Sequence, residues 1–198
     1  MKRVLLLMCK GTGILEAAAF HDVFGWSGTY GSESVEVVTT AIGTEVVCAF
    51  GLRVIVNHPL SEIDPARFDA LAIPGGLEQF GFYQDAYSPL VQLLITAFAE
   101  TKRPIASSCV GAMPVAKAGV LDGKRTSMYP ALEGKRKKQL EEFGAHSVSD
   151  PLVEDAGVIT STSPATASEV ALRLLSDLTG ADNAANIRYR MGFEPLSR

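Results

Sequence analysis

Short apolar segments alternate along this chain with longer segments of helical periodicity, and this alternation constrains the fold more than any other feature. Val4–Met8 is a continuous apolar run, which is typical of a strand buried on both faces of a parallel sheet. The expected strands are Val4–Met8, Val35–Thr40, Ala70–Ile73, Pro104–Ser108 and Gly157–Ser161. The expected helices are Ile14–Phe24, Pro89–Ala99, Gly111–Ala118, Glu133–Phe143 and a last one that ends at Leu178. The order predicts an α/β sandwich with a mainly parallel central sheet.

Glycine and capping signals set the expected ends of these elements. Gly25 is expected to end the first helix, and the polar, glycine-rich Ser27–Ser34 to form a loop. Val46–Ala49 and Leu52–Val56 predict a small hairpin. Thr166–Glu169 has the pattern of a capping box, in which a hydroxyl and a carboxylate each bind a free backbone N–H at the start of a helix.

Size and composition indicate a single domain over residues 1–198, with 47% hydrophobic and 20% charged residues. The net charge of −4 argues against a dedicated nucleic-acid binder, which usually carries a basic face. The basic run 135–138 is expected to be a solvated helix face, because its last two lysines precede glutamates by four residues. The amphiphilic segment 186–193 is expected to cover either the core or a seam between subunits.

The expected location is the cytoplasm. The start of the chain mimics a signal peptide, but its apolar part is too short and Lys10–Gly13 replaces a small-residue cleavage site. Apolar runs do not reach the roughly 18–20 residues that cross a bilayer, so no membrane association is expected. The odd set of cysteines, without a C-x-x-C pair, favours reduced thiols at Cys9, Cys48 and Cys109.

A strand that runs directly into a helix through Ser107–Gly111 carries the strongest chemical signal. Small residues surround Cys109 there, which is the pattern of a nucleophile elbow, and Gly111 allows close packing of the helix on the strand. The nearby helix N-terminus is expected to favour the thiolate. The competing interpretation is that Cys109 is a small buried hydrophobic residue.

Two more loops follow strands whose carboxyl ends meet the elbow at one edge of the sheet. Gly75 and Gly76 follow Ile73, and their N–H groups, with that of Val110, are expected to hold an oxyanion. A tight turn that needs a positive φ is the alternative. Glu16, at the start of the first helix, is expected to have a raised pKa and to share a proton with Cys109. A carboxylate stabilised by the helix dipole is the alternative there.

Neither a cofactor nor a metal is expected. Gly11–Glu16 begins with G-x-G, but Glu16 stands where a dinucleotide-binding loop needs a third glycine. The histidines show no metal-ligand spacing, at His21, His58 and His146.

Taken together, the motifs resemble the ThiJ/PfpI superfamily, the family of Parkinson disease protein 7, which has the class I glutamine amidotransferase-like fold. The resemblance covers about residues 3–178 and is carried by Lys10-Gly11 followed by Glu16, Ile73-Pro74-Gly75-Gly76, Ser108-Cys109-Val110-Gly111, Thr126-Ser127-Met128-Tyr129-Pro130, and Thr160-Ser161 followed by Glu169-Val170-Ala171-Leu172. It implies a flavodoxin-like three-layer sandwich, a homodimer, Cys109 as the reactive cysteine and Glu16 as its protonated partner. It also implies that Gly76 and Val110 supply the oxyanion donors.

Departures from the family pattern narrow the expected chemistry. Many relatives and the family's proteases have His directly after the cysteine, where this chain has Val110, and many deglycase-type members have His where this chain has Tyr129. A glutamine amidotransferase needs a His-x-Glu pair after the nucleophile, and His146 is followed by Ser147 and Val148. Isonitrile hydratases usually have Asp at the position of Glu16. A Cys–His protease is therefore not expected.

The expected function is that of a cysteine-dependent lyase or hydrolase that acts on a small electrophile, such as a reactive carbonyl, in the manner of a glyoxalase or deglycase. The alternatives are a redox-sensing stress-response protein, in which Cys109 oxidises to a sulfinate, and an isonitrile hydratase-like enzyme. The residues expected to line the substrate pocket, because of their loop positions, are Tyr129, Phe80, Phe82, Tyr83 and Met113.

Overall fold

A seven-stranded sheet organises the structure, which is a computed structural model that describes residues 1–130 and 134–193. The strand order is β10-β11-β7-β6-β1-β2-β5, and every neighbouring pair is parallel except β10 with β11. The strands are β1 (Lys2–Leu7), β2 (Val35–Ala41), β5 (His58–Pro59), β6 (Ala70–Ile73), β7 (Ile105–Ser107), β10 (Leu152–Asp155) and β11 (Val158–Ser161). The predicted α/β class with a mainly parallel central sheet is confirmed.

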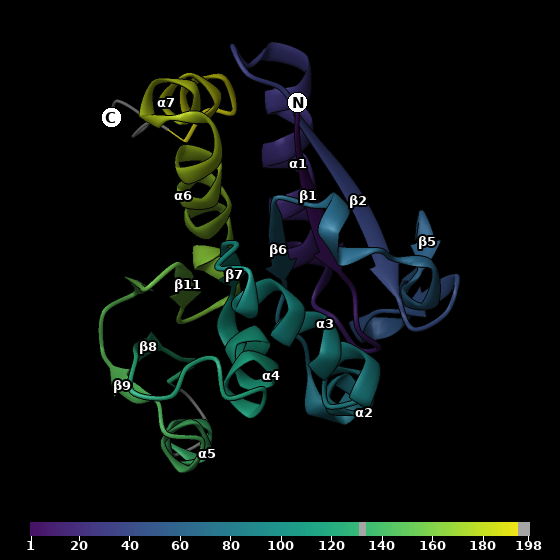
Figure 1. The fold of residues 1–198 in the computed structure, drawn as a ribbon, viewed down its shortest axis with the longest axis vertical. Helices are drawn as coiled ribbons and strands as arrows, with labels where there is room; N and C mark the ends of the chain where they lie inside the picture. The colour runs from purple at the N-terminus through teal and green to yellow at the C-terminus, as the bar shows by residue number, and fades with distance from the viewer. Residues whose placement is uncertain (131–133, 194–198) are drawn as a thin grey trace.

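Helices cover both faces of this sheet and complete the three layers (Figure 1). One layer holds α1 (Ile14–Tyr30), α6 (Ala167–Thr179) and α7 (Ala181–Arg190). The other layer holds α2 (Phe82–Ala86), α3 (Pro89–Glu100), α4 (Ala112–Lys117) and α5 (Lys135–Glu142). Short 3₁₀ turns lie at Ala49–Gly51, Leu60–Glu62, Pro65–Arg67, Glu78–Phe80, Cys109–Gly111 and Pro164–Thr166.

Two small strand pairs flank the main sheet. The predicted hairpin is present as β3 (Glu45–Val47) paired with β4 (Arg53–Ile55). A parallel pair, β8 (Arg125–Ser127) with β9 (His146–Val148), lies near α5. This second pair is absent from the predicted elements, because its strands are short and carry polar residues.

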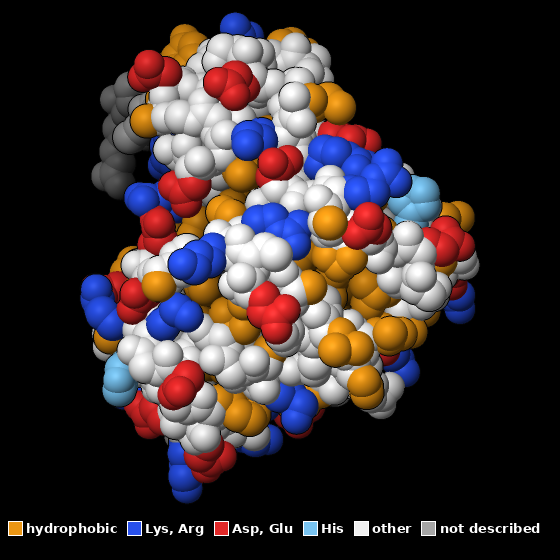
Figure 2. Space-filling model, in the orientation of Figure 1, with side chains coloured by type: hydrophobic (Ala, Val, Ile, Leu, Met, Phe, Trp, Pro, Cys, Tyr) orange, Lys and Arg blue, Asp and Glu red, His pale blue; other side chains and the backbone are white. Residues whose placement is uncertain are grey.

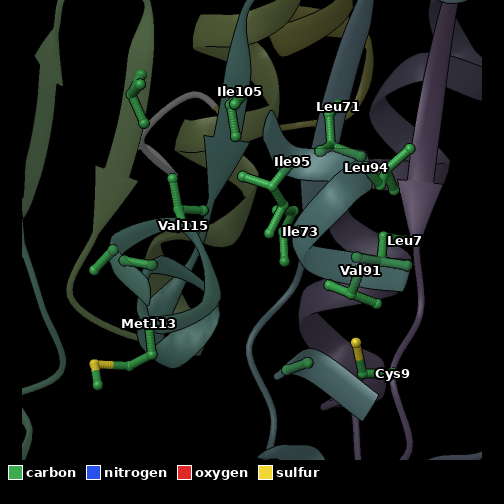
Figure 3. Packing of buried hydrophobic residues seen from close by; sticks show 14 of the residues in the cluster. Leu7, Cys9, Leu71, Ile73, Val91, Leu94, Ile95, Ile105, Met113 and Val115 are labelled. Atoms are coloured by element: carbon green, nitrogen blue, oxygen red, sulfur yellow. The ribbon is translucent and has the colours of Figure 1, made fainter. Parts of the chain in front are cut away.

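The side-chain alternation of β1 divides the core into two clusters. Val4 and Leu6 pack against the α1 and α6 layer, whereas Leu5 and Leu7 pack against the α3 and α4 layer. Figure 3 shows the second cluster, where Ile95 of α3 lies over the strands that carry Ile73 and Ile105. Both faces of the central strands are thus buried, which explains their continuous apolar sequences.

The first helix is longer than predicted. It runs past Gly25 to Tyr30, and Gly31 is its C-cap, so the first half of the expected loop Ser27–Ser34 is wrong. Tertiary contacts account for the extension, because Ser27 is fully buried and its hydroxyl accepts a 3.1 Å hydrogen bond from the Asn183 amide of α7. These contacts outweigh the low helix propensity of glycine.

The predicted capping box is also wrong. The Glu169 carboxylate forms two 2.8 Å bonds with the Arg188 guanidinium of α7. The Thr166 hydroxyl instead accepts a 3.2 Å hydrogen bond from the backbone N–H of Ser163. The expected helix Glu133–Phe143 corresponds to α5, except that Glu133 lies outside the described residues.

The part of the chain that the structure describes contains no helix long and apolar enough to cross a membrane.

Candidate active site

Cys109 lies at a sharp turn between β7 and α4, as the nucleophile-elbow pattern predicts. Its φ is 52°, a left-handed conformation that is costly for a residue with a Cβ. The turn also needs Gly111, because a Cβ there would lie 2.3 Å from the carbonyl oxygen of Ile73. The tight packing of the elbow on β6 therefore holds the thiol in its strained position.

Glu16 projects from the first turn of α1 and is 2% exposed. Its Oε2 atom accepts a 2.5 Å hydrogen bond from the Ser108 hydroxyl and a 2.9 Å bond from the Gly75 N–H. Burial raises the pKa of Glu16 to about 7, and the two hydrogen bonds oppose this rise. The alternative of an ordinary dipole-stabilised carboxylate does not explain a side chain so far removed from water.

Gly75 marks the point where the acid and the cysteine converge. A Cβ on Gly75 would lie 2.8 Å from Oε2 of Glu16 and 3.0 Å from the Cβ of Cys109. Charge couples the two groups, since a negative Glu16 raises the pKa of Cys109. Within residues 1–130 and 134–193, the hydrogen bonds of the carboxyl go to Ser108 and Gly75 and none joins it to the thiol, so the predicted sharing of a proton with Cys109 has no direct hydrogen bond behind it.

The thiol is buried but not sealed, with Cys109 6% exposed. Burial is the largest cause of the raised pKa of Cys109, and the charge on Glu16 is the second. The Val110 N–H and the Arg136 guanidinium lower this pKa. The helix N-terminus was expected to favour the thiolate, but desolvation outweighs such an effect and the pKa of Cys109 is raised overall. A protonated Glu16 removes the charge repulsion, so the protonation state of the acid controls how readily the thiolate forms.

The three predicted backbone donors have different roles. The Gly75 N–H binds Glu16, so it positions the acid and is not free to hold an oxyanion. The Val110 N–H faces the sulfur of Cys109. Among the hydrogen bonds of the described residues, none engages the Gly76 N–H. Gly76 and Gly75 do not adopt a positive φ, and Gly76 is required for space, because a Cβ there would lie 2.3 Å from the Phe82 ring.

The expected pocket residues are dispersed. Met113, which Figure 3 shows, and Phe82 are fully buried in the core, which corrects their placement in the pocket. Phe80 packs edge-on against Phe50 of the hairpin, with ring centroids 5.2 Å apart. Tyr129 is half-buried and packs against the core cluster that contains Cys109. The placement of Tyr129 and Tyr83 at the pocket stays a prediction.

Two polar partners of the site are absent from the prediction. One is Ser108, which binds Glu16, and the other is Arg136. The basic run is not wholly a solvated face, because Arg136 is 3% exposed. Lys137 does pair with Glu141 at 3.9 Å, as predicted. Helical spacing contained the missing signal, since Arg136 precedes the buried Leu140 by four residues and so shares its face.

The remaining candidate ligands lie apart from the site. His21 and His58 are exposed beside Asp22 and Glu62, and His146 is exposed on β9. In the described ranges, no three or more His, Cys, Asp or Glu side chains come together in a group that could hold a metal ion. The cysteines are free thiols, and burial raises the pKa of both Cys9 and Cys48.

Comparison with known proteins gives a match over nearly the whole chain. The profile described as the DJ-1/PfpI family matches residues 2–177. Protein dj-1beta of Drosophila melanogaster is 27% identical over 94% of this chain and 94% of its own length. The crystal structure of Drosophila melanogaster DJ-1beta matches with a TM-score of 0.83 at 26% identity, covering 96% of this chain and 97% of that one.

Two further relatives have names that describe an activity. The glutathione-independent glyoxalase DJR-1.2 of Caenorhabditis elegans is 27% identical over 77% of this chain and 78% of its own. A deglycase of Pyrococcus abyssi is 31% identical over 67% of this chain and 76% of its own.

The raised pKa of Glu16 predicts a specific pH dependence of stability. The folded protein keeps this proton up to a pKa of about 7, whereas the ordinary value is 4.5. Between these pH values the folded state binds more protons than the unfolded state, so the free energy of unfolding falls as pH rises. The expected loss is about 3 kcal/mol, and Glu16→Gln should lack it.

Urea unfolding of the wild type and Glu16→Gln from pH 4 to pH 8 would measure this difference. Glu100→Gln, at the exposed end of α3, is the control and should follow the wild type. Parallel curves for wild type and Glu16→Gln would contradict a protonated acid in the folded state.

Proposed function

The chain belongs to the DJ-1/PfpI family, and on this premise we propose that it is a cysteine-dependent enzyme for small reactive carbonyl compounds. The observation that carries the proposal is the convergence of Cys109 and Glu16 on Gly75, with the Val110 N–H facing the sulfur. The names of the glyoxalase and deglycase relatives support the same substrate class. The reaction is a hydration or hydrolysis, and Cys109 is the nucleophile.

In the proposed first step, the thiol proton of Cys109 passes to the Glu16 carboxylate, and the thiolate attacks the aldehyde carbon of a 2-oxoaldehyde. A carbon–sulfur bond forms, and the carbonyl electron pair moves to oxygen. The N–H groups of Val110 and Gly76 hold the oxyanion until Glu16 returns the proton to it. The product is a hemithioacetal, and the step balances without an oxidant or a reductant.

The hydrogen on the former aldehyde carbon then moves with its electron pair to the adjacent ketone carbon, and the hydroxyl proton of the hemithioacetal moves to the ketone oxygen. The hemithioacetal carbon becomes the carbonyl of a thioester of the 2-hydroxy acid. Hydrolysis by one water molecule releases the acid and restores the Cys109 thiol. The overall reaction adds one water to the 2-oxoaldehyde. Peptide hydrolysis is disfavoured, because Val110 occupies the position after the nucleophile and His21, His58 and His146 are exposed at other places.

A redox-sensing role is the second candidate. It is favoured by the hydrogen-bond donors near the sulfur, the Val110 N–H and protonated Glu16. Peroxide supplies two oxygen atoms in successive two-electron oxidations, which convert the Cys109 thiolate to a sulfenate and then to a sulfinate. The Val110 N–H already faces the sulfur, and protonated Glu16 places an acidic hydrogen beside it. Cys9 and Cys48 are buried without such donors, so oxidation should be selective for Cys109.

We also propose that the chain acts as a single domain that forms a homodimer in the cytoplasm. The hairpin of β3 and β4 presents apolar side chains to solvent, with Phe50 78% and Ile55 82% exposed, and Leu15 of α1 is 65% exposed. Figure 2 shows hydrophobic side chains gathered at the surface between α3 and β5, whereas charged ones are scattered over the rest of that face. Exposed apolar area of this kind suits a contact with a second copy.

Turnover of methylglyoxal by variants tests the enzymatic proposal. Cys109→Ser should abolish activity, because a hydroxyl is not ionised near neutral pH. Glu16→Gln should lower kcat by about 10²–10⁴-fold, the usual effect of losing a general acid–base group. Cys48→Ser is the control and should retain activity. Equal rates in the wild type, Cys109→Ser and Glu16→Gln would remove the catalytic claim.

Mild peroxide treatment followed by intact mass and peptide mapping tests the redox candidate. The wild type should gain two oxygen atoms at Cys109 and none at Cys9 or Cys48. Glu16→Gln should give less sulfinate, because its amide is a much weaker acid beside the oxidised sulfur. Uniform oxidation of the three cysteines would count against a sensor.

Molar mass by light scattering tests the dimer. The wild type should elute as a dimer and Ile55→Asp as a folded monomer, because a buried unpaired carboxylate opposes association. Lys138→Asp, at an exposed site on α5, is the control and should remain dimeric. A monomeric wild type at micromolar concentration would refute the proposal.

A further inference from the structure

A buried cation with unused donors lies beside the candidate nucleophile. The Arg136 side chain is 4% exposed, and its guanidinium lies 4.7 Å from the centroid of the Tyr83 ring. Nη1 donates to Gln139 at 2.7 Å and Nη2 donates to Glu78 at 2.5 Å. Within the described residues, neither the Nε of Arg136 nor the hydroxyl of Tyr83 has a hydrogen-bond partner.

Two unpaired polar groups so close together are unusual in a folded protein. A buried donor without an acceptor costs about 1–3 kcal/mol, and native structures contain few of them. The bonds to Glu78 and Gln139 explain why the guanidinium is tolerated, but they leave Nε–H unexplained. Both atoms are shielded from water, so an acceptor reaches them only by displacing part of their cover.

The pair belongs to the surroundings of Cys109. Charge on Arg136 lowers the pKa of Cys109, and charge on Cys109 raises that of Tyr83, so the three groups share one electrostatic environment. Tyr83 also packs against the core cluster that contains Cys109. Phe82, which precedes Tyr83 in α2, lies against Gly76, and the neighbouring Gly75 lies against Cys109, so α2 and the elbow pack on the same loop.

The charges around Arg136 indicate which charge a bound ligand should carry. Arg136 and Lys135 share the single carboxylate of Glu78, at 2.5 and 3.5 Å. One positive charge remains uncompensated when Glu16 is protonated and Cys109 is a thiol. A ligand with one negative charge would neutralise the cluster, and a carboxylate accepts from an arginine N–H and a hydroxyl at once.

We propose that Arg136 and Tyr83 bind a carboxylate on the substrate, so that the site prefers carbonyl compounds that carry one negative charge near the reacting carbon. The carboxylate accepts hydrogen bonds from Nε of Arg136 and from the Tyr83 hydroxyl while the carbonyl carbon meets the Cys109 sulfur. This inference rests on the proposed function for the carbonyl chemistry. The anion-binding part depends only on the donors.

Two alkylating reagents of nearly equal size test the anion site directly. Iodoacetate carries a carboxylate and iodoacetamide a neutral amide, and with each the Cys109 thiolate forms a carbon–sulfur bond as iodide leaves. The ratio of their rates at Cys109 cancels any change in the thiolate population, because both reagents consume the same thiolate. A purely structural role for Arg136 would change both rates together and leave the ratio unchanged.

The wild-type ratio of iodoacetate to iodoacetamide rates should exceed that of free glutathione. Tyr83→Phe and Arg136→Met should each lower it about tenfold, the effect of losing one hydrogen bond to a charged group. Tyr87→Phe, whose ring lies 4.8 Å from that of Tyr83, is the matched control and should keep the wild-type ratio. Tyr83→Phe removes only an unpartnered hydroxyl, so it tests the site even where Arg136→Met does not fold.

Glyoxylate provides the second readout, because it combines a carboxylate with an aldehyde. It should protect wild-type Cys109 from iodoacetamide at about tenfold lower concentration than in Tyr83→Phe. A wild-type rate ratio equal to that of glutathione, or unchanged in Tyr83→Phe, overturns the anion site. A normal anion response without methylglyoxal turnover would refute the proposed function alone, and turnover without the anion response would refute this inference alone.

Discussion

The carboxyl group of Glu16, held by the Ser108 hydroxyl and the Gly75 N–H, is the interaction on which the rest of the site depends. These bonds connect the start of α1, the loop after β6 and the elbow after β7. A buried carboxyl requires partners, and here its partners come from the segments that must be aligned. The carboxyl of Glu16, whose burial is unfavourable by itself, thereby also fixes the geometry of the site.

Proton position follows from the same arrangement. Burial keeps Glu16 protonated up to a pKa of about 7, and the neutral acid does not repel a charge on Cys109. Burial also raises the pKa of the thiol, so both groups favour their neutral, protonated forms. The Val110 N–H and Arg136 act in the opposite direction and favour the thiolate. In the proposed mechanism, the charge coupling between Glu16 and Cys109 controls the reactivity of the sulfur without a histidine next to it.

Strands with strong local signals could be predicted from the sequence. Ala70–Ile73 matches β6 residue for residue, since a four-residue apolar run bounded by Pro74 leaves little freedom. The end of α1 could not be predicted, because contacts from α7, more than 150 residues away in the sequence, carry the helix past Gly25. Hydrogen bonds of this kind have no local pattern. The same limit explains the failure of the capping box, where Arg188 captures the Glu169 carboxylate.

The site was predictable in its residue types and less so in their roles. The elbow and the acid stand out by position, and the structure brings both to Gly75. Two roles could not be predicted, because they depend on distances that only a folded chain defines. The Gly75 N–H binds the Glu16 carboxyl, and the glycines are needed for lack of space for a Cβ and not for a positive φ. Arg136 was hidden within a basic run, although its spacing to Leu140 placed it on the buried face.

The hydrogen bond between α1 and α7 links the C-terminal part of the fold to the helix that carries the acid. Asn183 bonds Ser27 on the last turns of α1, and the first turn of that same helix presents Glu16 to the thiol. The 17 residues of α1 span about 25 Å, so the two contacts lie near opposite ends of one helix. The contact with α7 therefore helps to fix the axis of the helix that carries the acid.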